Sequence, residues 1–143
     1  MIAFLQRIKR FSRALCSAWV LVLVGVLYGA CGIADPSKNA QDVFTAPLSV
    51  GGVNTHTFSA SKSGEFSVTV NSVSPDASTI LGTAFGQILS GGCALVPGYV
   101  NGFSRLNIAA LTGPIDKGNY CIQVYDPGSL TRSETYTVTV SHP

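Results

Sequence analysis

Charged residues are scarce in this chain, making up 11% of its 143 residues. Four of the nine basic residues (Arg7, Lys9, Arg10 and Arg13) lie within the first 13 positions, whereas all seven acidic residues follow residue 30. The chain after residue 30 therefore has five basic and seven acidic side chains, a formal charge of −2. Proteins that neutralise nucleic-acid phosphates carry a clustered basic surface. We therefore exclude nucleic acid as a partner.

Histidine is nearly absent, and no motif is present that would activate a nucleophile. His56 and His142 are the only histidines, and no Gly-x-Ser-x-Gly sequence exposes a serine. No Asp-x-Asp loop concentrates ligands for calcium. Asp76, Asp116 and Asp126 each fall in a turn, where aspartate is favoured for its hydrogen bonds to the backbone. We expect no catalytic residue, metal or cofactor, and we interpret both histidines as exposed polar strand residues.

The N-terminus combines a basic start with a long apolar run. Residues 14–34 contain no charge over 21 positions, and about 20 apolar residues suffice to span a bilayer. Basic residues stay on the cytoplasmic side while the apolar segment enters the membrane. Residues 1–30 are therefore expected to form an export segment, with the rest of the chain outside the cytoplasm.

Three fates of this export segment remain open. Cys31 follows two small residues and resembles the lipidated cysteine of bacterial lipoproteins, although Tyr28 stands where the motif usually has leucine. In that case Gly32, which replaces the aspartate that retains many lipoproteins in the inner membrane, favours the outer membrane. Alternatively, a signal peptidase cuts after Ala30 or Ala34 and the protein is secreted, or the uncut helix anchors it. All three place the protein in the cell envelope or outside the cell.

The cysteines leave one pair available for a disulfide. Cys16 lies in the export segment and Cys31 is the lipidation candidate, so Cys93 and Cys121 remain in a compartment where disulfides persist. Their bridge would close a loop of about 28 residues and contribute about 3–4 kcal/mol. Two cysteines without a neighbouring histidine make a poor zinc site.

Residues 31–143 have the composition and periodicity of an all-β domain. Ser and Thr number 25 there against 12 charged residues, and alternation of apolar and polar residues marks several strands. The segments with this pattern are 55–60, 65–71, 79–89, 104–111, 119–125 and 135–141. We predict an antiparallel β-sandwich of seven or eight strands over residues 48–143, preceded by a lipidated tether and linker over residues 31–47.

Two features of this predicted sandwich bear on ligand binding. Gly82 and Gly86 predict a bulge or a close backbone approach in their strand. Residues 91–102 are interpreted as a glycine-rich loop, which the disulfide would tie over the outside of the sheet that contains Cys121. The aromatic residues Tyr99, Phe103 and Tyr125 are candidate contacts for a stacked sugar.

Three segments resemble the bacterial pre-peptidase C-terminal domain. They are Phe58 to Val70, with Gly64 before Phe-x-Val-x-Val; Lys117 to Val124, with its Gly-x-Tyr start; and Tyr136 to Val140, which reads Tyr-x-Val-x-Val. The resemblance covers residues 48–143 and implies a jelly-roll-like sandwich. Domains of this family are often appended to secreted peptidases and also occur alone. The family has no catalytic residues to carry over.

These observations predict a non-catalytic binding or structural module of the cell envelope or extracellular space. Its partners would be the membrane, through a lipid anchor or the N-terminal helix, and a protein or glycan ligand at the cell surface. The alternative is an accessory domain or subunit of a secreted hydrolase, such as a peptidase.

Overall fold

A computed structural model of the protein describes residues 38–143. These residues form eight β-strands and no α-helix, and none of this part of the chain is a helix that could span a membrane. The strands are β1 (Ala40–Leu48), β2 (Val53–Ala60), β3 (Gly64–Ser74), β4 (Leu81–Leu89), β5 (Gly92–Ser104), β6 (Ala109–Ile115), β7 (Gly118–Tyr125) and β8 (Glu134–His142). Residues Asp35–Pro143 make up a compact unit by themselves.

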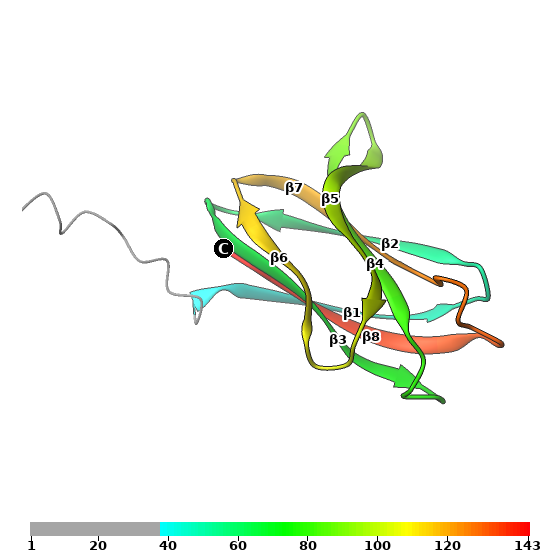
Figure 1. The fold of residues 1–143 in the computed structure, drawn as a ribbon. Helices are drawn as coiled ribbons and strands as arrows, with labels where there is room; N and C mark the ends of the chain where they lie inside the picture. The colour runs from blue at the N-terminus through cyan, green and yellow to red at the C-terminus, as the bar shows by residue number, and fades with distance from the viewer. Residues whose placement is uncertain (1–37) are drawn as a thin grey trace, which may run out of the picture. The chain divides into compact units, whose positions relative to one another are not determined.

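The strands form two four-stranded antiparallel sheets that pack face to face (Figure 1). The first sheet has the order β1-β8-β3-β6 and the second sheet the order β2-β7-β4-β5. Every connection except the β4–β5 hairpin crosses from one sheet to the other, which is the connectivity of a jelly roll. The predicted antiparallel β-sandwich is therefore confirmed.

Alternation along the central strands builds the core. In β3, β7 and β8, every second residue faces the opposite sheet, while the residues between them are largely polar. The fully buried valines and isoleucine of these strands are Val68, Val70, Ile122, Val124, Val138 and Val140. These are residues that the alternation in the sequence places inside.

Aromatic rings join the two sheets at the centre of this core. Phe66 of the first sheet stacks on Phe85 of the second sheet, with ring centroids 4.2 Å apart. Phe85 in turn lies 5.4 Å from Tyr120, and Tyr120 lies 5.8 Å from Phe58. The four rings come from β3, β4, β7 and β2, so this aromatic cluster fixes how the sheets are stacked.

The structure differs from the sequence expectations in three segments. Strand β1 starts at Ala40, inside the stretch 31–47 that was expected to be a tether, because it pairs with β8 along its whole length. The expected glycine-rich loop 91–102 is mostly strand β5, paired with β4. The expected strand 104–111 is interrupted at Asn107, whose φ of 59° turns the chain before β6 begins at Ala109.

Asp126 ties two loops together at one end of the sandwich. Its Oδ2 accepts a hydrogen bond from the Gly51 N–H at 2.8 Å, and its Oδ1 accepts from the N–H groups of Gly128, Ser129 and Leu130. The Gly51 N–H and these further donors lower the pKa of Asp126 to about 2. The carboxylate thus links the β1–β2 turn to the β7–β8 loop.

We expect Asp126→Asn to lower the melting temperature at neutral pH. We also expect the melting temperature of the variant to change less than that of wild type as the pH is lowered. The folded-state pKa lies below the ordinary 3.8, so this stabilisation is present above about pH 4 and is lost as the pH falls towards 2. Thermal melts between pH 2 and 7 measure the effect. Asp116→Asn, whose carboxylate accepts one hydrogen bond from Ser63, is the control, and equal pH profiles for wild type and Asp126→Asn would contradict this account.

Candidate functional site

The outer face of the second sheet is crossed by the Cys93–Cys121 disulfide. Cys121 lies on β7 and Cys93 on β5, and β4 runs between those two strands. Two strand spacings in a flat sheet amount to ~9.6 Å, yet the two Cα atoms are 5.9 Å apart. The start of β5 therefore bends out of the sheet and over β4. This confirms the predicted disulfide and its position on the outside of the sheet.

Gly86 makes the crossing sterically feasible. It lies opposite both Cys121 and Leu95, and a Cβ at this position would be 2.6 Å from the Ala94 carbonyl oxygen and 2.9 Å from the Cys121 Sγ. The β4–β5 register shifts between Ala84 and Gly86. The sequence expectation of a close backbone approach in this strand is thus met at Gly86.

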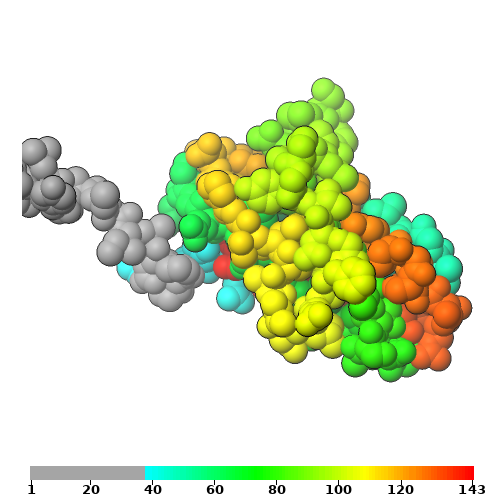
Figure 2. All heavy atoms as spheres, in the orientation of Figure 1, coloured from blue at the N-terminus to red at the C-terminus, as the bar shows by residue number. Residues whose placement is uncertain are grey.

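The bend raises the β4–β5 hairpin above the sheet. The hairpin turns through Ser90 and Gly91, whose φ angles of 51° and 83° are both left-handed, as a two-residue type I′ turn requires. The end of the hairpin projects from the body of the sandwich (Figure 2).

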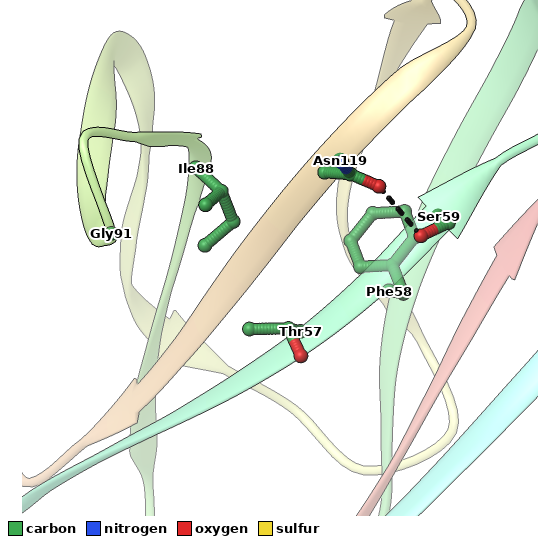
Figure 3. Close-up of a pocket in the computed structure, with 6 residues that line it drawn as sticks. All are labelled: Thr57, Phe58, Ser59, Ile88, Gly91 and Asn119. Carbon is green, nitrogen blue, oxygen red and sulfur yellow. Dashed lines mark hydrogen bonds between the residues drawn. The ribbon is translucent and has the colours of Figure 1, made fainter.

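A pocket lies between this hairpin and the outer face of β2 and β7 (Figure 3). We call it the hairpin pocket; its cavity volume is ≈ 350 Å³, and its lining residues are Thr57, Phe58, Ser59, Ile88, Gly91 and Asn119. The Ser59 hydroxyl donates a hydrogen bond to Asn119 Oδ1 at 2.8 Å. This leaves the Asn119 amide N–H groups and the Thr57 hydroxyl available to a ligand. No lining side chain is charged.

The three aromatic residues expected to contact a ligand are separated in the structure. Tyr99 packs on the core, with its ring 5.8 Å from Phe66 and 5.6 Å from Phe85. Tyr125 lies flat over Gly82, where a Cβ would be only 2.2 Å from the tyrosine ring. Phe103 is 68% exposed. Of the three expected ligand contacts, only Phe103 and Tyr125 therefore lie on the outer surface.

His56 is not the exposed residue that was expected. It shares the inward face of β2 with Phe58, stacks on Phe44 at 4.6 Å and forms a 2.6 Å hydrogen bond between its Nε2 and the hydroxyl of the buried Tyr136. Burial lowers the pKa of His56 and raises that of Tyr136. Both groups are therefore held neutral, and the pair bridges the two sheets.

His142 is buried as well, which also differs from the expectation. Its Nε2 lies 3.1 Å from Asp42 Oδ2, whereas its Nδ1 is buried with no hydrogen-bond partner. A hydrolytic triad needs a serine hydroxyl on the second ring nitrogen. The Asp42–His142 pair lacks one, and its geometry is that of a structural contact between β1 and β8.

The carboxylates of the turn aspartates are used in hydrogen bonds within or between turns. Asp76 Oδ1 accepts hydrogen bonds from the N–H and hydroxyl of Ser78, which lower the pKa of Asp76. Within residues 38–143, no three His, Cys, Asp or Glu side chains come together as a metal site would require. Cys31 and the export segment 1–30 lie outside the residues that the structure describes.

The residues that line the hairpin pocket were missed from the sequence. Thr57 and Ser59 alternate with core residues on β2, and this outward orientation directs them into the pocket. Asn119 is the cross-strand neighbour of Ser59 on β7, and Ile88 completes the lining from the β4–β5 hairpin. The signal available in the sequence was the combination of Gly86 with the two cysteines.

Comparisons with known proteins identify the fold but no family. No family model matches the chain, and no curated protein matches its sequence. A mitogen derived from Yersinia pseudotuberculosis is similar in structure, with a TM-score of 0.51 and 9% identity over 73% of this chain and 87% of that chain. At this identity the similarity shows the β-sandwich fold alone.

Two further solved structures are similar at lower TM-scores. The pre-peptidase C-terminal domain of a Bacillus anthracis collagenase has a TM-score of 0.41 and 14% identity over 68% of this chain and 87% of its own. PliG from Aeromonas hydrophila, a periplasmic inhibitor of g-type lysozyme, has a TM-score of 0.43 and 14% identity over 73% of this chain and 88% of its own. The strand order and the Cys93–Cys121 bridge define the class as a disulfide-braced jelly-roll sandwich.

Replacing both cysteines by serine is expected to lower the free energy of unfolding by about 3–4 kcal/mol, because the bridge closes a loop over a sequence separation of 28. Urea denaturation of the variant and of wild type with and without reductant measures this. Reduced wild type should match the variant. Coincident curves for oxidised and reduced wild type would contradict the prediction.

Gly86→Ala is expected to cost about 1–3 kcal/mol of stability, because the new methyl group overlaps backbone atoms of Ala94 and must displace the hairpin. The matched control is Gly92→Ala in the same hairpin, where the nearest atom is 3.9 Å away. Urea denaturation of both variants tests the difference. A control that loses as much stability as Gly86→Ala would rule out the proposed overlap.

Proposed function

We propose that the protein is a non-catalytic binding domain that acts outside the cytoplasm and holds a neutral glycan in the hairpin pocket. Export is supported by the basic and apolar pattern of residues 1–30 and by the Cys93–Cys121 disulfide, since disulfides persist in oxidising compartments. In this proposal Cys31 carries the lipid that holds the domain at the outer membrane, with a linker of a few residues before β1.

The chemistry of the residues that line the pocket supports a neutral glycan as the ligand. Its polar groups are the Thr57 and Ser59 hydroxyls and the Asn119 amide, which donate and accept hydrogen bonds without charge. Ile88 adds an apolar wall. A charged ligand would lose hydration without gaining an ionic partner, whereas a sugar presents hydroxyl and amide groups beside apolar C–H faces.

The size and setting of the pocket agree with a binding role. A volume of ≈ 350 Å³ lies at the lower end of the range of about 300–1,000 Å³ for ligand sites. The disulfide fixes the hairpin wall relative to β7, so the pocket needs little reordering on binding, which lowers the cost of association.

We expect Thr57→Val and Asn119→Ala to weaken glycan binding about fivefold each, since each removes a ligand hydrogen bond worth about 1 kcal/mol. Titration of labelled residues 35–143 with a panel of neutral oligosaccharides, chitotetraose among them, should shift the NMR resonances of Thr57, Ile88 and Asn119. An acidic oligogalacturonate serves as the charged comparison.

Thr112→Val on the first sheet is the matched control, because Thr112 is also an exposed strand residue and lies far from the pocket residues in the strand order. Its affinity should equal that of wild type. Tighter binding of the acidic probe, absence of binding across the neutral panel, or equal losses in Thr57→Val and Thr112→Val would each overturn the proposed function.

A further inference from the structure

The four edge strands of the sandwich differ in how they are protected. The edges are β1 and β6 of the first sheet and β2 and β5 of the second sheet. An exposed edge presents unpaired N–H and C=O groups, and proteins block such edges with proline, charge or bulges. Strands β1, β5 and β6 carry Pro47, Pro97 and Pro114, respectively.

Strand β2 has none of these protections. Its eight residues, Val53–Ala60, include no proline and no Asp, Glu, Lys or Arg. It pairs with β7 from end to end without a register shift, so no bulge bends it away. Among the edges in the described part of the chain, β2 alone is an open template for another strand.

We propose that β2 pairs with β2 of a second copy of this chain, in antiparallel orientation across a two-fold axis. Such pairing closes both open edges at once, whereas an added peptide would only transfer the free edge to itself. The outward residues Val53, Thr55, Thr57 and Ser59 are uncharged, so no like charges meet across the axis. The chain's small net charge after residue 30 adds little long-range repulsion.

The pairing would place two hairpin pockets on one continuous eight-stranded face. Thr57 and Ser59 lie on β2 and line the pocket, so the pockets of the two copies lie on either side of the axis and open to the same side. A repeating polymer could then occupy both pockets, and linked sites bind more tightly than either alone. The pairing itself rests on the edge and does not depend on which ligand the pocket takes.

Charge at Thr55 provides the test in solution. Thr55 is exposed, lies outside the pocket and sits close to the middle of β2, so Thr55 of the two copies would be neighbours. In sedimentation equilibrium of residues 35–143, we expect a monomer–dimer equilibrium for wild type. Thr55→Lys and Thr55→Glu should each weaken dimerisation at least tenfold, and an equimolar mixture of the two should recover it.

Thr112→Lys on the proline-protected edge β6 is the matched control and should dimerise like wild type. In the full chain, a photo-reactive benzoylphenylalanine at position 55 should give a cross-linked dimer in intact membranes, whereas one at position 112 should not. A wild type that stays monomeric to 1 mM, equal weakening by Thr55→Lys and Thr112→Lys, or cross-links from position 55 only to another protein would overturn the proposal.

Discussion

Stacking of aromatic rings between the two sheets is the interaction on which the rest of the structure depends. Phe66 reaches from the first sheet onto Phe85 of the second sheet, and Phe58 and Tyr120 extend the cluster to β2 and β7. Ring pairs of this kind contribute about 0.5–1.5 kcal/mol beyond their burial. Because side chains alternate along a strand, fixing these rings inside also fixes Thr57, Ser59 and Asn119 on the outer face. The core therefore determines which residues are available to a ligand.

The disulfide adds the second constraint, which the core alone does not supply. A hairpin that only continued β4 and β5 would leave the outer face of the second sheet flat. Cys93 and Cys121 draw the start of β5 across β4, and the absence of a side chain at Gly86 leaves room for this crossing. Ile88 and Gly91 then lie across β7 from the β2 residues and form one wall of the pocket. Covalent bracing thus converts a sheet surface into a concave site.

The alternation of apolar and polar residues predicted the central strands of the fold. The alternation in β3, β7 and β8 is visible in the sequence because every second residue in the alternating stretch is a valine, isoleucine, phenylalanine or tyrosine facing the core. Strand β5 was not visible in the sequence, because Gly92, Gly98 and Gly102 give it the composition of a loop. The left-handed Asn107 breaks an apparent strand without any change in composition. His56 could have been placed inside, because it shares the face of Phe58; the pocket could not, because it needs the bend of the hairpin.

The two outer faces of the sandwich differ in a way that favours the second sheet for the proposed binding. On the first sheet, two pairs of outward polar side chains satisfy each other: the Thr45 and Thr137 hydroxyls are 3.0 Å apart, and Thr139 donates to Asn71 at 2.6 Å. These four side chains gain little from a ligand, because each new hydrogen bond would replace an existing one. The second sheet has a pocket with unused donors and an exposed Phe103. The proposed recognition is therefore favoured on the outer face of the second sheet, because a concave surface and unused hydrogen-bond donors occur together there.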